Sequence, residues 1–189
     1  MILPIYAYGQ PVLKNEAEII NPLTYPGLEV LVQNMFETMY AAKGVGLAAP
    51  QIGLSIKLFI LDSTPYQKED EENKFIGMKK VFINPAIVDE SGEEWAFEEG
   101  CLSIPEVRAD VDRIPNIKIE YQDMEGKWHI ESYDGLNARV IQHEHDHIMG
   151  ILFIDHLKPL KKRMLQRRLD YIRKGQVESD YKIKFYRAK

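Results

Sequence analysis

The sequence has few of the features that mark secreted, membrane or nucleic-acid-binding proteins. Cys101 is the only cysteine among 189 residues, which excludes an internal disulfide and favours a cytoplasmic location. No stretch approaches the roughly 18 apolar residues needed to cross a bilayer, and the first residues have neither the basic region of a signal peptide nor its small-residue cleavage site after an apolar core. The net charge of -5 argues against a general nucleic-acid binder. We therefore expect a cytoplasmic protein with no membrane partner.

The composition favours a folded core. Hydrophobic residues make up 45% and charged residues 28% of the chain, as in ordinary globular proteins. A chain of this length buries roughly 70% of the surface that its unfolded form exposes. We expect a single domain over residues 1–189, in which residues 159–189 form a C-terminal helix and tail.

Apolar periodicity divides the chain into helices and strands. Three segments have helical spacing, namely 25–43, 136–149 and 160–174. Five segments have strand character, namely 56–62, 81–89 (interrupted near Pro85), 117–123, 128–134 and 181–187. The charged residues 68–73 suggest a solvated loop. A helix, then strands, then helices predicts an α+β fold rather than repeated βαβ units.

The stretch GVGLAAPQIG, residues 44–53, matches the G-x-G-x-x-A pattern of a dinucleotide-binding turn. That pattern requires a strand before it and a helix after it. Here a predicted helix precedes it, and Pro50 obstructs a new helix. The glycines have a different use, because backbone without side chains lets an extended peptide approach closely.

The strongest chemical signal is the H-E-x-x-H match in QHEHDHIMG, residues 142–150. On a helix, residues four apart lie on one face, so His143 and His147 can direct their imidazoles at one metal ion. Glu144 lies about 100° around the helix from His143, where it can reach a water near that ion. A chance match on an ordinary helix is the competing interpretation, but the histidine pair with the glutamate favours metal binding.

Two histidines leave a catalytic metal site short of one protein ligand. Cys101, Asp155 and His156 are all candidates for the third, and the residues alone do not choose among them. We expect His145 to point away and to be exposed. Asp146 is a candidate partner for the second nitrogen of a ligating histidine.

Three segments together resemble a known family. GVGLAAPQIG (44–53), EGCLSIP (99–105) and QHEHDH (142–147) are similar, in the same order, to the three signature motifs of peptide deformylases. The resemblance implies a small α+β fold with antiparallel strands packed around the H-E-x-x-H helix. It also implies the reaction, which is removal of the N-formyl group from nascent chains that begin with N-formylmethionine, with release of formate.

The resemblance implies which residues bind the metal. They are Cys101, His143 and His147, with water in the fourth position. Fe²⁺ is the metal implied in the cell, and Zn²⁺, Ni²⁺ or Co²⁺ can occupy such a site. Sequence does not choose among these ions, since nitrogen and sulfur ligands bind all of them.

The resemblance also implies the catalytic groups. Glu144 is the general acid and base, while Gln51 and the backbone N–H of Leu102 donate hydrogen bonds to the oxyanion. The backbone near Gly46 pairs with the peptide substrate. A neutral amide suits position 51, because a charged group there would compete for the metal or its water.

Methionine specificity needs an apolar pocket. Val45 and Val140 are candidates for its wall, although both suit an ordinary core equally well. Arg139 lies one helical turn before His143, and we expect its stem to line the pocket while its charged head stays in water. Glu98 and Glu99 either meet the substrate or pair with Arg139.

Two questions stay open at this stage. The basic helix 160–174 can contact ribosomal RNA, or it can be a solvated helix face. The alternative functions are an H-E-x-x-H peptidase that uses His156 as its third ligand and a metal-binding module without catalysis.

Overall fold

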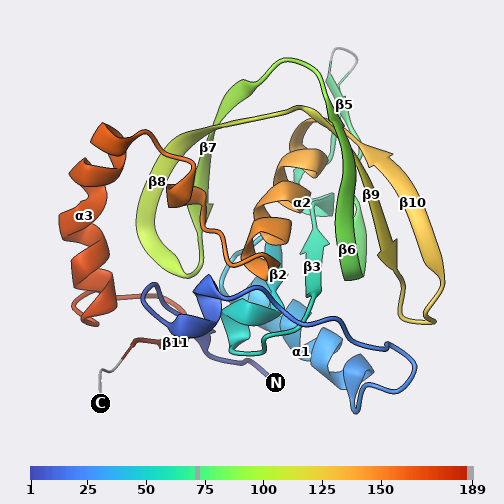
Figure 1. Ribbon diagram of the computed structural model, residues 1–189, viewed down its shortest axis with the longest axis horizontal. Helices are drawn as coiled ribbons and strands as arrows, with labels where there is room; N and C mark the ends of the chain where they lie inside the picture. Colours follow the sequence, from blue (N-terminus) through green and yellow to red (C-terminus); the bar gives the residue numbers. More distant parts are fainter. Residues whose placement is uncertain (71–72, 187–189) are drawn as a thin grey trace.

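A computed structural model describes residues 1–70 and 73–186. The helix α2 (Gly135–Ile148) lies at the centre, between a five-stranded antiparallel sheet and a separate β-hairpin (Figure 1). The sheet has the order β10-β9-β6-β3-β2, and these strands are Trp128–Tyr133, Asn116–Gln122, Lys79–Ser91, Leu58–Asp62 and Gly46–Ala48. The hairpin pairs β7 (Trp95–Cys101) with β8 (Ile104–Arg113). The α+β prediction, with strands around a central helix, is confirmed.

The outer helices pack on different parts of this frame. Helix α1 (Leu28–Ala41) buries one apolar face that includes Met35 and Met39. It begins three residues later than the expected Tyr25, because Gly27 adopts a left-handed conformation at φ 69°. Helix α3 (Pro159–Arg173) packs against β8 and buries Leu169 and Ile172.

The remaining elements are short. They are the strands β1 (Ile5–Tyr6), β4 (Lys68–Asp70), β5 (Asn73–Phe75) and β11 (Ile183–Lys184), and the 3-10 helices η1 (Pro11–Lys14), η2 (Ala49–Ile52), η3 (Thr64–Tyr66) and η4 (Phe153–Asp155). Strand β11 pairs in parallel with β1, so the predicted edge strand exists but is shorter than residues 181–187, the last of which lies outside the described residues.

Two local predictions have instructive outcomes. The interruption near Pro85 is a β-bulge, since the register of β6 against β9 shifts between Ile83 and Ala86. The loop predicted for residues 68–73 is wrong in part, because β4 and β5 pair there as an antiparallel hairpin, while residues 71 and 72 lie outside the described residues. Charge alone did not reveal backbone pairing between these short strands.

Among the described residues, no helix has both the length and the apolar character required to cross a membrane.

Candidate metal centre and substrate pocket

The three side chains expected to bind the metal meet at one point. Helix α2 presents His143 and His147 one turn apart, with ring centroids separated by 5.0 Å. Cys101, at the end of β7, approaches from the hairpin, and its Sγ lies 3.2 Å from Nε2 of His147. One ligand atom from each residue lies within 4.8 Å of the others. Of the three candidates for the third ligand, the one that lies with the two histidines in this cluster is Cys101.

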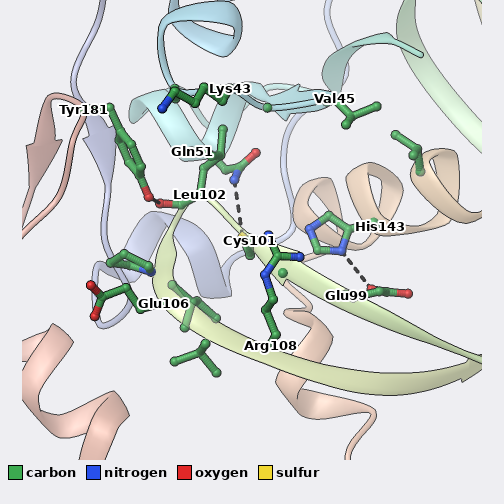
Figure 2. A pocket seen from close by; sticks show the side chains of 18 of the residues that line it. Lys43, Val45, Gln51, Glu99, Cys101, Leu102, Glu106, Arg108, His143 and Tyr181 are labelled. Atoms are coloured by element: carbon green, nitrogen blue, oxygen red, sulfur yellow. Dashed lines mark hydrogen bonds and ion pairs between the residues drawn. The ribbon is translucent and has the colours of Figure 1, made fainter. Parts of the chain in front are cut away.

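The donor set fits a divalent late transition metal. Burial raises the pKa of the Cys101 thiol, but the imidazoles of His147 and His143 outweigh burial and lower that pKa to about 5. A thiolate with two imidazoles is a typical ligand set for Zn²⁺ or Fe²⁺. His143 uses its Nδ1 for a hydrogen bond, which leaves Nε2 to face the cysteine (Figure 2).

That hydrogen bond goes to Glu99, which is 5% exposed (Figure 2). Its Oε2 lies 2.9 Å from His143 Nδ1 and 3.0 Å from Arg113 Nη2, and its Oε1 lies 2.7 Å from Arg113 Nε and 3.1 Å from Arg139 Nη1. Burial raises the pKa of the Glu99 carboxyl, but hydrogen bonds from His143 and Arg113 outweigh burial and hold that pKa well below its usual range. Glu99 is therefore an ionised group that orients the imidazole of His143.

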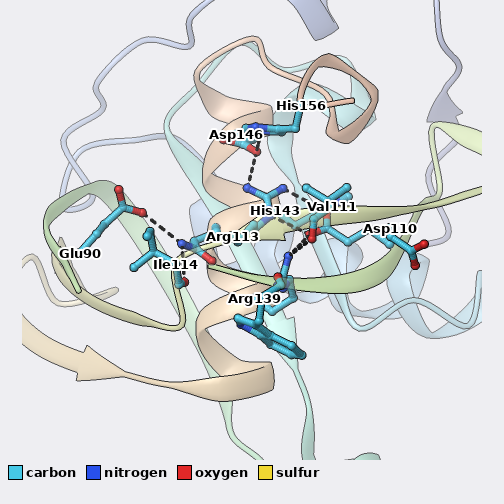
Figure 3. A network of polar contacts seen from close by, with 12 residues as sticks. Glu90, Asp110, Val111, Arg113, Ile114, Arg139, His143, Asp146 and His156 are labelled. Atoms are coloured by element: carbon cyan, nitrogen blue, oxygen red, sulfur yellow. Dashed lines mark hydrogen bonds and ion pairs between the residues drawn. The ribbon is translucent and has the colours of Figure 1, made fainter. Parts of the chain in front are cut away.

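The expectation that Asp146 orients a ligating histidine is wrong. Asp146 instead accepts hydrogen bonds from Arg113 Nη1 at 2.8 Å and from His156 Nε2 at 2.7 Å (Figure 3). Sequence reasoning missed the role of Glu99 in orienting His143, because the two residues are 44 positions apart in the chain.

The prediction that Arg139 keeps its head in water is also wrong. Its side chain is 3% exposed, and its guanidinium lies 4.4 Å from the centre of the Trp95 ring. Nη2 donates to the Trp95 carbonyl at 2.7 Å and Nη1 donates to the Val111 carbonyl at 2.8 Å, while Glu99 balances the charge (Figure 3). The proposed pairing of Glu99 with Arg139 is confirmed, and burial is tolerated because these partners replace water.

Glu144 is 4% exposed, and its Oε2 has no hydrogen-bond partner among the described residues. Burial raises the pKa of this carboxyl to about 7, against the opposing effect of the two imidazoles. The side chain lies directly over Gly46, where an added Cβ would stand 2.5 Å from its Oε1. Position 46 therefore needs glycine to leave room for this carboxylate.

Gln51 is 1% exposed and is oriented by the backbone. Its Oε1 accepts a hydrogen bond from the Ala48 N–H at 2.8 Å, so its amide nitrogen points to the opposite side. That nitrogen lies 3.5 Å from Cys101 Sγ (Figure 2). It also lies 3.3 Å from Ser103 Oγ. The 3-10 helix η2, rather than a nucleotide-binding helix, follows the two glycines and carries this amide.

A pocket of about 900 Å³ opens beside these groups. Its lining contains every residue expected to bind substrate, namely Val45, Gly46, Arg139 and Val140, together with Gln51, Leu102 and Glu144. His145 lies outside the metal-ligand cluster and is partly buried rather than exposed.

Comparisons with known proteins agree with this geometry. The family model described as polypeptide deformylase matches residues 2–163. Peptide deformylase of Christiangramia forsetii is 56% identical over 194 aligned positions, covering 100% of this chain and 98% of the relative. The Flavobacterium johnsoniae peptide deformylase is 51% identical, with the same two shares covered.

Solved structures lead to the same family. The peptide deformylase of Thermus thermophilus superimposes with a TM-score of 0.81 at 38% identity, covering 93% of this chain and 99% of that one. The Legionella pneumophila enzyme gives 0.79 at 38% identity, covering 93% and 98%. With a family match over most of its length and relatives that align from end to end, the chain belongs to the polypeptide deformylase family, the metal-dependent hydrolases that remove the N-formyl group from newly made polypeptides.

Proposed function

We propose that Cys101, His143 and His147 hold one divalent ion, which is Fe²⁺ in the cell and is replaceable by Zn²⁺, Ni²⁺ or Co²⁺. The support is the convergence of their ligand atoms within 4.8 Å and the fixed orientation of His143 on Glu99. A divalent ion in such a site polarises a carbonyl and lowers the pKa of water to about 7.

Glu144 is the general base and then the general acid. It takes a proton from the water that attacks the formyl carbon. It returns that proton to the peptide nitrogen as the carbon–nitrogen bond breaks, which gives formate and a free amino terminus. The pKa of the Glu144 carboxyl is about 7, and its Oε2 has no hydrogen-bond partner among the described residues. Such a carboxyl suits both proton transfers at neutral pH.

Gln51 and the backbone N–H of Leu102 stabilise the oxyanion. The Gln51 amide nitrogen is held toward Cys101 before substrate arrives, because Ala48 holds the other end of the amide. A pre-oriented donor of this kind is worth roughly 3 kcal/mol of the barrier.

The substrate is a nascent peptide that begins with N-formylmethionine. Val45 and Val140 form the apolar wall of the methionine pocket, and the backbone at Gly46 pairs with the peptide. The Arg139 stem lines the same pocket, while its head is held by Glu99.

The observation that carries this assignment is the buried Glu144, whose Oε2 has no partner among the described residues, beside the cluster of Cys101, His143 and His147. The test is formate release from a formyl-Met-peptide by anaerobically purified protein, with mass spectrometry of the remaining peptide. We expect formate and an otherwise intact peptide, whereas internal cleavage would favour a peptidase.

Two variants separate the candidate third ligands. Cys101→Ser should lose most of its bound metal, and His156→Gln should keep it. The opposite pattern would indicate the peptidase arrangement, and retention of metal by both variants would contradict the proposed ligand set.

The identity of the metal is tested separately. Protein purified without oxygen from cells grown in ordinary medium should contain mainly iron by elemental analysis. Its activity should decay in air and return after Fe²⁺ or Ni²⁺ is added to the metal-free protein. Zinc as the main metal in fresh preparations would contradict the assignment of Fe²⁺.

The cytoplasm is the expected compartment, because nascent chains are made there, and the basic helix α3 is the candidate ribosome contact. Several of its cations are already engaged, for example Lys162 with Asp155 at 2.8 Å and Lys161 with Asp110 at 3.6 Å. Arg163 and Lys174 are exposed and make no ion pair among the described residues. Changing both to Ala should weaken co-sedimentation with ribosomes at low salt, and unchanged binding would exclude this face of α3.

A further inference from the structure

The C-terminal tail returns to the substrate pocket after α3 ends. Residues 178–181 contribute to the pocket lining, although the family match stops at residue 163. The tail therefore brings side chains to the active site from a part of the chain that the family motifs do not include.

Backbone pairing fixes the tail in this position. The Ile5 N–H donates to the Lys182 carbonyl at 2.8 Å, and the Ala7 N–H donates to the Lys184 carbonyl at 3.0 Å. The next N–H along the same segment, that of Tyr8, donates to the Ser103 carbonyl at 2.8 Å. The N-terminal segment thus joins the tail to the turn that follows Cys101.

Tyr181 makes a direct contact with that turn. Its hydroxyl donates to the Leu102 carbonyl at 2.6 Å, and its ring packs at the edge of the core around α1 (Figure 2). Burial raises the pKa of the Tyr181 hydroxyl to about 12, so the group remains a donor at neutral pH.

The turn needs outside partners. Cys101 pairs with Ile104 across the hairpin, which leaves Leu102 and Ser103 as its two central residues. The peptide between them has its carbonyl held by Tyr181, and its N–H lies 3.4 Å from Cys101 Sγ. One peptide group is thereby fixed between the tail and the sulfur of the metal centre.

We propose that Tyr181 is a positioning residue for deformylation, whose hydroxyl holds the Leu102–Ser103 turn so that the Leu102 N–H faces the oxyanion. This inference rests on the proposed role of Leu102 in the reaction. The donor N–H belongs to the peptide that precedes Leu102, so rotation of the next peptide changes the backbone angles at Leu102 and misdirects the donor. A displacement of this kind weakens the transition state more than it weakens substrate binding.

The test compares the wild type with Tyr181→Phe and Tyr181→Leu. The Phe variant keeps the packed ring and loses only the hydroxyl. We expect its kcat for a formyl-Met-peptide to fall about tenfold, with KM changed less than about twofold and with full metal content, because one positioning hydrogen bond is lost. The Leu variant should lose little more than the Phe variant.

Tyr171→Phe is the matched control, since its hydroxyl bonds to Arg167 on α3 at 3.1 Å and does not line the pocket. It should retain wild-type kcat. A Phe variant that matches the wild type would overturn the inference, whether or not the Leu variant is impaired, because the hydroxyl would then be dispensable. Absence of formate release by the wild type would instead overturn the proposed function.

Discussion

Glu99 and Glu144 are both buried carboxylates at the metal centre, yet their surroundings are opposite. Glu99, on the β7 side, accepts hydrogen bonds from Arg113, Arg139 and His143. Glu144, on the α2 side, leaves Oε2 without a partner in the part of the chain that the structure describes. The pKa of the Glu99 carboxyl is held well below its usual range, whereas burial raises that of Glu144 to about 7.

The difference shows that donors, rather than depth of burial, decide what a carboxylate does here. The exposed fractions of the two residues are 5% for Glu99 and 4% for Glu144. Surrounded by cations, Glu99 stays ionised and orients an imidazole. Glu144 has no hydrogen-bond donor on Oε2 among the described residues, so it is able to accept and release a proton near neutral pH.

The largest expected effect is on catalysis by Glu144→Gln. This change should lower kcat for formate release about 10³-fold, because the proton carrier is lost. It should not lower the melting temperature of the metal-free protein, since a buried charge without a partner is removed. Glu94→Gln, at an exposed position between β6 and β7, is the control and should behave as the wild type. Near-normal turnover would show that another group moves the proton.

Glu99→Gln should lower the stability of the protein, whereas Glu144→Gln should not. The buried Arg139 loses its counter-charge and Arg113 keeps only that of Asp146, which should cost about 3 kcal/mol in the free energy of unfolding measured by urea denaturation. Metal affinity, measured by titration against a chelator, should fall about 10- to 100-fold, because His143 loses its orienting partner.

The neighbour Glu98 provides the control for that change. Its side chain is 61% exposed and lies 3.8 Å from Arg108, so Glu98→Gln should alter stability by less than about 0.5 kcal/mol. If Glu98→Gln and Glu99→Gln destabilise the protein equally, the cation cluster around Glu99 is not what distinguishes the two glutamates.

Sequence reasoning succeeded where the relevant geometry is local. The spacing of His143 and His147 places both on one helical face, and the structure brings them together with Cys101. The context of GVGLAAPQIG excluded a nucleotide-binding turn, and the structure has a 3-10 helix there. These conclusions depend on neighbours within a few residues.

Sequence reasoning failed where the partner lies far along the chain. Glu99 and His143 are separated by 44 positions, and nothing in their local sequence reports that they touch. The head of Arg139 was expected in water, with pairing to Glu98 or Glu99 as one alternative, but Glu99 and the carbonyls of Trp95 and Val111 supply the partners that make burial possible. Tyr181 and Leu102 are 79 positions apart, so the role of the tail was equally hidden.

Gly46→Ala should move Glu144 without removing it. The new Cβ would stand 2.5 Å from Glu144 Oε1, so the carboxylate must shift. We expect kcat to fall about tenfold, because a small misplacement of a catalytic group is costly. Gly100→Ala is the control, since the nearest atoms to its added Cβ would be those of Arg108, at 3.5 Å or beyond. Equal activity of the two variants would show that Glu144 tolerates displacement.

The smallest effect concerns Asp155, where two lysines surround a carboxylate at the surface. Lys162 lies 2.8 Å from Oδ1, and Lys14 also pairs with the group. Burial raises the pKa of this carboxyl, but hydrogen bonds from Lys14 and Lys162 outweigh burial and lower it to about 2. Because the pKa is lowered by folding, the stabilisation is present above the unfolded value of about 4 and is lost as the pH falls toward 2.

Asp155→Asn should therefore lower the free energy of unfolding by about 1 kcal/mol at pH 7, a figure reduced for solvent screening, and by much less near pH 2. The measurement is urea denaturation at both pH values, with Asp89→Asn as the control. Asp89 is exposed and makes no ion pair among the described residues, so its change should be small at both pH values. If Asp155→Asn lowers the free energy of unfolding as much as Glu99→Gln does, the surrounding cations alone account for the stabilisation by Glu99. If it lowers that free energy far less, the burial of the cations around Glu99 is what makes their counter-charge indispensable.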